Sequence, residues 1–272
     1  MASSDATGFG AAFRFTLLTN DPDLAAAADA AGVDRIGLDI ERLGKAERQE
    51  HSPSARISTH HLSDLTRIRD HVSRAGLFCR LDPPHPGGWD QIERALDLGA
   101  NCLMLPFFRE VGQAAAFAAA VAGRAETILL VETAAAALRI EQLAALEGVD
   151  EIMVGLNDLS WDSGLGSRFE LLTSPLVEAM ARTVRAAGKV FGIGGVARWD
   201  DRGMPTPADL VYAQYPRLGA EAGWLSRSFL EGLGPDDLAA AIGDARGRLD
   251  HWSRQDAATL EAARQELSKV FG

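Results

Sequence analysis

The sequence predicts a (β/α)8 barrel, and two observations support this prediction. Eight short apolar runs alternate with alanine-rich amphipathic segments, which is typical of an α/β protein with a parallel sheet. The length of 272 residues suits a fold that usually takes about 250 residues. An open doubly wound sheet is the alternative, but no G-x-G-x-x-G motif follows the first run. The expected strands are 13–18, 35–40, 77–81, 102–106, 127–132, 151–155, 190–194 and 222–226.

Glycines separate the amphipathic segments from the apolar runs that follow them. Glycine just past a helix end adopts the left-handed cap at little steric cost, so each marks a helix that stops and leads into a strand. The repeated unit is therefore the αβ half of a βαβ motif. The glycines in question are Gly32, Gly76, Gly99, Gly123, Gly148, Gly188 and Gly219.

Two connections, 41–58 and 159–174, are longer than a barrel needs. Both follow expected strands, so both should lie at the C-terminal face, where barrel enzymes carry out their chemistry. We expect a flexible N-terminus over 1–10, the barrel over 11–250 and an extra C-terminal helix within 251–272. The alternating charges of that helix suggest a solvated or subunit-contacting element.

The overall composition limits the functional class. A net charge of −11 argues against nucleic-acid binding, although it allows a small anionic substrate. No run approaches the ~20 apolar residues of a membrane span, and the N-terminus has no signal-like segment. Cys79 and Cys102 both fall in expected strands, which suits buried thiols in a reducing compartment. We therefore expect a cytoplasmic protein that engages neither membrane nor nucleic acid.

Glu132 and Asp158 each stand where an apolar run ends and a loop begins. If the two runs are neighbouring parallel strands, both carboxylates emerge at the same end of the sheet, on strands about 5 Å apart. Two carboxylates this close resist ionising together without a cation, and Mg²⁺ is typically bound by one or two of them. The pair predicts a divalent-metal site, while two ordinary loop acids, with Asp158 capping a helix, are the alternative.

Arg80 and His60 are further candidates for the same face. Arg80 ends the third run, so its planar fork should reach over the barrel mouth to bind carboxylate or phosphate; a salt bridge to Asp82 is the alternative. His60 and His61 precede an expected helix, where a histidine could act as a general base. Capping of that helix by a surface histidine is an equal alternative.

Asp97, Gly194 and Gly195 carry weaker signals. Asp97 lies near the end of an expected helix, where a solvated acid is the usual interpretation. Gly194 and Gly195 close the seventh run, and loops after the seventh and eighth strands often bind phosphate through backbone N–H groups. Close packing of loop and strand explains a short glycine cluster equally well.

The stretch 129–160 resembles the HpcH/HpaI aldolase and citrate lyase beta-subunit family. Val131-Glu132-Thr133 and Gly155-Leu156-Asn157-Asp158-Leu159-Ser160 match the family pattern IET…GVDG…G-P-x-DLS at the same spacing. The resemblance extends more weakly over about 15–229. It implies a (β/α)8 barrel with Mg²⁺ or Mn²⁺ that cleaves or forms C–C bonds next to a 2-oxo acid or a CoA thioester. It also implies a homo-oligomer, either a trimer or a hexamer.

By this resemblance, Glu132 and Asp158 correspond to the metal ligands. Arg80 corresponds to the arginine that holds the substrate carboxylate and the enolate oxygen. Asp97 corresponds to an acid that pairs with a catalytic histidine in the aldolase branch. Gly155 and Asn157, together with Gly194 and Gly195, are expected to line the substrate site.

The chain departs from the family pattern at two places. The aldolase branch carries GEH after the second strand, and Arg42 stands in place of that histidine. Arginine cannot serve as a base near neutral pH, so Arg42 would instead pair with Asp97 or bind a second substrate carboxylate. Proton transfer would then pass to His60 or to a metal-bound water. Leu156-Asn157 also replaces the proline before the DLS motif.

Three functions are therefore open. The first is a metal-dependent lyase or aldolase that acts on a small 2-oxo acid through an enolate. The second is a CoA-thioester lyase of the citrate lyase beta or malyl-CoA type, which would need a basic groove that the sequence does not suggest. The third is a barrel that binds a metabolite without turnover, which the loss of the histidine base favours.

Overall fold

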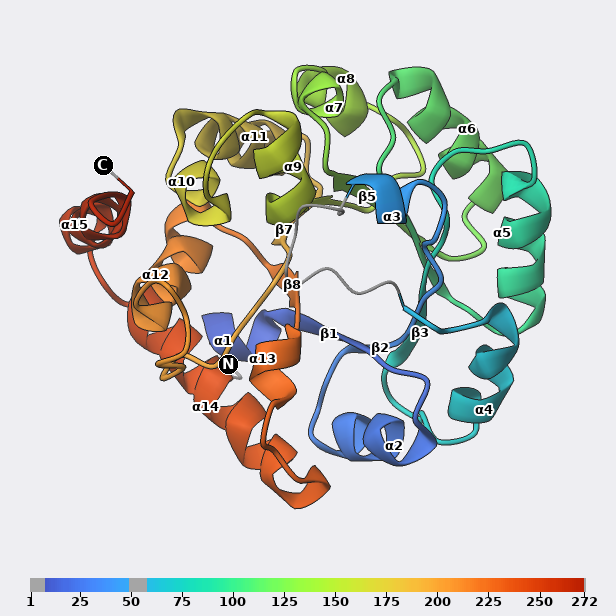
Figure 1. Cartoon of the computed structure of the whole chain (residues 1–272), viewed down its shortest axis with the longest axis horizontal. Coiled ribbons are helices and arrows are strands. Elements are labelled where there is room, and N and C mark those ends of the chain that lie inside the picture. Colours follow the sequence, from blue (N-terminus) through green and yellow to red (C-terminus); the bar gives the residue numbers. More distant parts are fainter. Residues whose placement is uncertain (1–7, 49–57, 272) are drawn as a thin grey trace, which may run out of the picture.

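The computed structural model describes residues 8–48 and 58–271, and its eight parallel strands close into a barrel in the order of the chain (Figure 1). The predicted fold is therefore confirmed, and each expected strand boundary lies within two residues of the observed one. The strands are β1 (Arg14–Leu18), β2 (Arg35–Asp39), β3 (Gly76–Arg80), β4 (Cys102–Leu105), β5 (Glu126–Val131), β6 (Glu151–Val154), β7 (Val190–Ile193) and β8 (Ala222–Trp224).

Helices surround the barrel on its outer side (Figure 1). Gly219 shows how a helix ends: it takes φ +64°, and its N–H donates to the Pro216 carbonyl. Gly76 is different from the other predicted caps, because it begins β3 itself. The helices are α1 (Phe9–Ala12), α2 (Pro22–Ala30), α3 (Lys45–Arg48), α4 (Leu65–Arg69), α5 (Gly88–Asp97), α6 (Val111–Val121), α7 (Ala134–Ala137), α8 (Ile140–Ala144), α9 (Leu156–Asp162), α10 (Arg168–Leu172), α11 (Pro175–Ala186), α12 (Ala208–Leu218), α13 (Arg227–Leu230), α14 (Leu238–Ser253) and α15 (Ala257–Ser268).

The strands bury side chains on both faces, because the helices cover the outside and the barrel encloses the inside. Side chains alternate along a strand, so each strand supplies two separate apolar clusters. Cys79 belongs to the large cluster beneath the helices, whereas Cys102 belongs to the small one inside the barrel. Both thiols are buried and free. The inner cluster consists of Phe78, Cys102, Met104, Ile128, Leu130, Met153 and Ala222.

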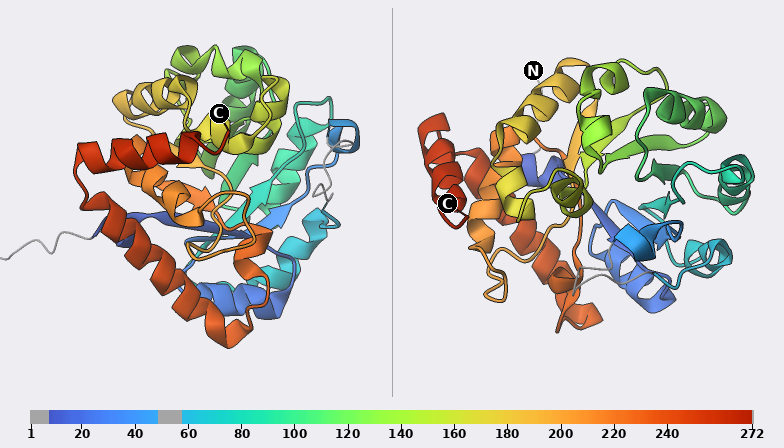
Figure 2. Two further views of the ribbon diagram at one scale, coloured as in Figure 1. Left: turned by 60° about the vertical axis from the view of Figure 1, so that its left-hand side comes forward. Right: turned by 45° about the horizontal axis from the view of Figure 1, so that its top comes forward.

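The two ends of the described chain pack on the same side of the barrel (Figures 1 and 2). Residues 8–10 of the segment expected to be flexible are described: Phe9 begins α1, and a Cβ on Gly10 would lie 2.0 Å from the Arg246 carbonyl oxygen of α14. Residues 1–7 lie outside the described residues. The extra helix α15 lies outside α12 and buries Ala263 and Leu267. None of the described helices has both the length and the apolar character to cross a membrane.

Candidate functional site

Glu132 and Asp158 lie at the C-terminal end of neighbouring strands. Glu132 directly follows β5, and Asp158 lies in the first turn of α9, which follows β6 after Gly155. β5 and β6 pair in parallel, with Val131 opposite Val154. Both acidic residues are buried, at 3% and 8% exposure. The sheet therefore directs two desolvated carboxylates into one end of the barrel.

Neighbouring loops hold the Glu132 carboxylate. The Phe107 N–H donates to Glu132 Oε2 at 3.3 Å, and Phe107 takes a left-handed φ of +44° that is unusual for an aromatic residue. Gly155 packs against the same side chain: a Cβ at this position would lie 2.4 Å from Glu132 Cγ. The glycine of the G-L-N-D motif therefore leaves space for the carboxylate rather than serving only as a turn.

Asp162 joins the loops that follow three successive strands. Its carboxylate accepts from the Ala134 N–H at 2.7 Å and from Arg109 Nη2 at 2.9 Å. Asn157 is exposed, and its side-chain oxygen accepts from Arg168 Nη1 at 3.3 Å. Asp162 and Arg168 were not among the residues predicted from sequence, because nothing in their local pattern separates them from ordinary surface charges.

Arg80, at the end of β3, points across the barrel mouth. Its Nε and Nη2 donate to the two Asp39 carboxylate oxygens at 2.9 and 2.7 Å. Its guanidinium carbon lies 5.1 Å from the ring centre of Trp224, which ends β8. Burial disfavours the charged form, but Asp39 and Glu41 outweigh this and raise the pKa of Arg80 above its ordinary value. The salt-bridge partner of Arg80 is therefore Asp39, and not Asp82, which the sequence had suggested as the alternative.

Lys45 is a member of the site that sequence reasoning missed. Its side chain is buried, and its Nζ lies 3.0 Å from both Asp39 Oδ2 and Glu41 Oε2. The Glu41–Lys45 spacing of i, i+4 is a weak signal for such a pair. Nothing in the sequence indicates that a lysine beside so many charged residues turns inward.

His60 lies beside this cluster in a defined tautomer. The Asp39 N–H donates to His60 Nδ1 at 3.1 Å, so the neutral ring carries its proton on Nε2. Burial is the main cause that lowers the pKa of His60, with Asp39 and Asp64 opposing it. With its Nδ1 lone pair engaged, His60 is set up to donate a hydrogen bond from Nε2 rather than to take a proton there. This geometry does not favour the base role that we expected for His60.

Gly194 and Gly195 have conformational roles that require no bound anion. A Cβ on Gly194 would lie 2.7 Å from the Trp224 indole, so this glycine makes room for the ring at the barrel mouth. Gly195 takes φ +89°, which a side chain would strain. The structure therefore agrees with the close-packing alternative for Gly194.

The residues at the mouth suit a magnesium-like ion, although a cluster of three or more His, Cys, Asp or Glu ligands is absent from the described residues. Mg²⁺ usually keeps several waters and takes only one or two protein carboxylates, so a larger cluster is not required. Glu132 and Asp158 are buried carboxylates that follow adjacent strands. Carboxylate oxygens are the ligands that Mg²⁺ and Mn²⁺ prefer, so this donor set fits either ion. Asp39 and Glu41, also buried at the mouth, contact Lys45 and Arg80.

Comparison with known families identifies the family of the chain. The family model described as HpcH/HpaI aldolase/citrate lyase matches residues 14–201, which is more than half of the chain. The chain belongs to this family. The match includes Arg80, Glu132 and Asp158, the three residues that the resemblance identified most clearly.

Characterised relatives of the chain carry aldolase names. A 4-hydroxy-4-methyl-2-oxoglutarate aldolase from Hapsidospora irregularis is 25% identical over 222 residues, covering 68% of this chain and 75% of the relative. A second, from Chaetomium globosum, is 37% identical over 76 residues, which is 28% of either chain. A 4-hydroxy-2-oxovalerate aldolase from Novosphingobium aromaticivorans is 32% identical over 132 residues, covering 38% of this chain and 50% of the relative.

Solved structures at low sequence identity share the fold. The CitE protein of Mycobacterium tuberculosis, in complex with magnesium and acetate, is 18% identical with a TM-score of 0.59 and covers 94% of this chain and 98% of its own. The citrate synthase SbnG is 17% identical with a TM-score of 0.61 and covers 88% and 95%. These likenesses support the barrel architecture.

The structure corrects the expectation that Asp97 pairs with Arg42. Asp97 ends α5, which returns the chain to the start of β4, so it lies at the N-terminal end of the barrel and is exposed. Its charge acts there on Arg124. Arg42 follows β2 at the other end of the barrel, where its Nη2 donates to the His60 carbonyl at 2.9 Å. The two residues therefore lie at opposite ends of the barrel.

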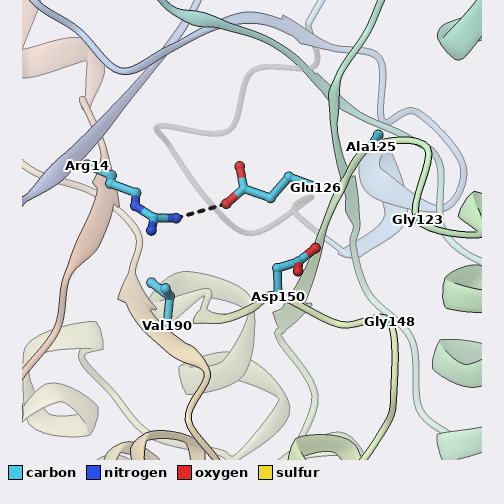
Figure 3. Close-up of a pocket in the computed structure, with 7 residues that line it drawn as sticks. All are labelled: Arg14, Gly123, Ala125, Glu126, Gly148, Asp150 and Val190. Atoms are coloured by element: carbon cyan, nitrogen blue, oxygen red, sulfur yellow. Dashed lines mark hydrogen bonds and ion pairs between the residues drawn. The ribbon is translucent and has the colours of Figure 1, made fainter.

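A pocket also opens at the N-terminal end, away from the candidate site (Figure 3). Arg14 points into it toward Glu126, and the two side chains are joined at 2.9 Å. Gly148, Asp150 and Val190 line its other sides. This end of a barrel normally contributes to stability. The pocket therefore does not change the assignment of the candidate site to the C-terminal mouth.

Proposed function

We propose that this chain is a divalent-metal-dependent carbon–carbon lyase of the aldolase type that acts on a small 2-oxo acid. The observation that carries the proposal is the pair of buried carboxylates, Glu132 and Asp158, at the ends of adjacent strands at the mouth reached by Arg80. Glu132 and Asp158 would hold Mg²⁺ or Mn²⁺. The bound ion would supply positive charge where the 2-oxo oxygen becomes negative.

Arg80 is suited to bind the same oxygen or the neighbouring carboxylate. Its Nε and Nη2 are taken by Asp39, so its Nη1 edge is the part of the guanidinium left for a substrate. The Trp224 ring lies against the guanidinium, with its centre 5.1 Å from the guanidinium carbon. A fixed cation aimed at a developing negative charge lowers a reaction barrier by several kcal/mol, or about 10²–10³ in rate. These contacts favour a small, planar, anionic substrate.

The named relatives suggest a 4-hydroxy-2-oxo acid as the substrate class. In a retro-aldol step the 4-hydroxyl gives its proton to a water molecule, which later returns a proton to C3, and the C3–C4 bond breaks. The C4 fragment leaves as a carbonyl compound, and the bonding electron pair passes into the enolate of the 2-oxo fragment. Protonation at C3 then gives the 2-oxo acid product. Arg80 would stabilise the negative enolate oxygen throughout.

Proton exchange on pyruvate tests this proposal. Pyruvate in D₂O with the wild-type chain and Mg²⁺ should lose its methyl signal in NMR, because enolate formation exchanges the C3 protons. Glu132→Gln, or removal of Mg²⁺ with a chelator, should abolish the loss. Glu126→Gln serves as the matched control, since Glu126 begins the same strand at the other end of the barrel. Equal exchange with and without metal would contradict metal dependence, and no exchange would count against a pyruvate-type enolate.

The oligomeric state and the cellular compartment of the protein remain predictions. We propose a homotrimer or homohexamer in the cytoplasm, on the resemblance to the family. Analytical ultracentrifugation of the full chain would test the assembly, and a monomer would contradict it.

A further inference from the structure

Lys45 carries a buried ammonium group at the barrel mouth that the proposed reaction does not use directly. Its side chain is 5% exposed, and its Nζ lies 3.0 Å from Asp39 Oδ2 and 3.0 Å from Glu41 Oε2. Ordering and desolvating a long lysine side chain is unfavourable unless its partners compensate. A lysine held this way therefore has a specific effect on its two acidic partners.

Lys45, Asp39, Arg80 and Glu41 form a closed ring of charges that alternate in sign. Asp39 Oδ2 accepts from Lys45 Nζ at 3.0 Å and from Arg80 Nη2 at 2.7 Å. Glu41 Oε2 completes the ring at 3.0 Å from Lys45 Nζ and 3.5 Å from Arg80 Nη2. All four side chains are at most 10% exposed. The interactions are therefore screened little by solvent.

The ring determines which edge of Arg80 is available. Asp39 occupies Nε and Nη2, so the guanidinium plane is fixed and Nη1 remains. Without the Lys45 charge, Asp39 and Glu41 would lose the ammonium group that lies between them, while both would still contact Arg80 Nη2. Two buried carboxylates that share one cation repel each other, and one of them must move or take up a proton. Either change turns the guanidinium away from its present orientation against Trp224.

We propose that Lys45 is the positioning residue that keeps Arg80 aimed at the substrate, by separating the Asp39 and Glu41 carboxylates. The inference rests on the proposed function for the identity of the substrate, but not for the geometry of the ring. It also assigns a role to this segment of the chain. Arg42, which replaces the family histidine, is exposed, whereas Lys45 is buried at the mouth.

Lys45→Met tests the proposal, because methionine keeps much of the side-chain length and removes the charge. The probe is oxalate, a planar dianion shaped like the enolate of pyruvate, and its binding in the presence of Mg²⁺ is measured by calorimetry. We expect Lys45→Met to weaken oxalate binding about 10- to 100-fold, as for a misplaced binding group. Binding of Mg²⁺ alone should change by less than about threefold, since such a misplacement leaves Glu132 and Asp158 in place. Lys269→Met, at an exposed pair with Glu266, is the matched control and should leave both affinities unchanged.

The double variant Glu41→Gln/Lys45→Met keeps the proposal testable if the single variant does not fold. It removes one charge of each sign, so Arg80 again faces one carboxylate. We expect it to fold and to recover most of the oxalate affinity. A folded Lys45→Met with wild-type oxalate affinity would overturn the proposal, as would a double variant that binds oxalate no better than a folded single variant.

Failure of the proposed function would be visible separately. If the wild-type chain neither binds oxalate nor exchanges pyruvate protons, the substrate assignment is wrong. A crystal structure of Lys45→Met, or of the double variant beside the wild type, then decides the positioning role. Arg80 still paired to both oxygens of Asp39 in Lys45→Met would overturn it. The positioning role would be supported if Arg80 were displaced in Lys45→Met and returned to its wild-type position in the double variant.

Discussion

The two ends of the barrel hold their charged side chains in different arrangements. At the N-terminal end, Arg35 bonds Glu126 and Glu151 at 2.6 Å each, and Arg14 bonds Glu126 at 2.9 Å. Arg35 and Glu151 are buried, whereas the side chains of Arg14 and Glu126 are 42% and 26% exposed, so a buried pair of opposite charges is extended by a partly exposed one. At the C-terminal mouth, Lys45 and Arg80 contact Asp39 and Glu41 in a buried group, and Glu132 and Asp158 are buried at the ends of the next strands.

This difference suggests that the N-terminal end contributes mainly to stability and the C-terminal mouth mainly to function. A balanced network compensates its own desolvation, and its loss leaves a buried charge unpaired. At the mouth, Glu132 and Asp158 follow adjacent strands on the face where barrel enzymes carry out their chemistry. We therefore expect substitutions at the N-terminal end to affect mainly unfolding and those at the mouth to affect mainly activity.

Glu132→Gln should give the largest effect on activity. Loss of a charged ligand should slow metal-dependent exchange of pyruvate protons by at least about 10³-fold. This corresponds to a barrier that is roughly 4 kcal/mol higher. Glutamine keeps the shape of the side chain, so the variant should still fold, which its melting curve will show. Glu126→Gln should show the opposite pattern, with full exchange and a lower melting temperature. If both variants behaved alike, the comparison between the two ends would be wrong.

Arg35→Met should give the largest effect on stability. Glu151 is fully buried, and burial already raises its pKa although Arg35 opposes this. Removing the arginine leaves that carboxyl unpaired, so the free energy of unfolding measured in urea should fall by about 3–5 kcal/mol. The folded fraction should retain wild-type exchange per molecule. A loss below about 1 kcal/mol would mean that the network contributes little.

Asp39→Asn should destabilise the chain in a pH-dependent way. Burial favours the neutral carboxyl, but Arg80 and Lys45 outweigh it and hold the pKa of Asp39 well below its ordinary 3.8. A depressed pKa contributes stability that is complete above the unfolded-state pKa and is lost as the pH falls through the folded-state pKa. The free energy of unfolding of the variant, measured in urea, should therefore be about 3 kcal/mol lower than that of the wild type at pH 7. This difference should shrink below about pH 4.

The control for this prediction is Asp97→Asn, at an exposed helix end. It should change the unfolding free energy by less than about 0.5 kcal/mol at either pH. A difference between Asp39→Asn and wild type that stayed constant from pH 7 to pH 3 would contradict the linkage.

Gly155→Ala should give the smallest effect. The new methyl would lie 2.4 Å from Glu132 Cγ, so the carboxylate must move. Displacing one ligand should weaken Mg²⁺ binding about 10- to 100-fold, measured by calorimetry. Gly166→Ala is the matched control in the following loop, because nothing lies within 4 Å of its Cβ position. Equal Mg²⁺ affinity in both alanine variants would show that Glu132 is not held by this contact.

The local sequence pattern was sufficient to predict the fold. Buried parallel strands bury both faces, so each appears as a short apolar run, and each of the eight was found within two residues. The strand ends placed Glu132, Asp158 and Arg80 together at one face, because all parallel strands point the same way. These predictions depended on chain direction and periodicity alone.

Side-chain partners were decided by the tertiary structure. The sequence suggested Asp82 for Arg80 and Asp97 for Arg42, but strand pairing brings Asp39 of β2 opposite Arg80 of β3. α5 carries Asp97 to the far end of the barrel.

Chain direction and apolar periodicity thus determined by themselves the barrel, its strands and the end that carries the chemistry. The inward turn of Lys45, the tautomer of His60 and the Trp224 contact with Arg80 depend on residues distant in the chain. Only the closed barrel decides them, because hydrogen bonds and ion pairs act over a few ångströms in space, whatever the separation in sequence.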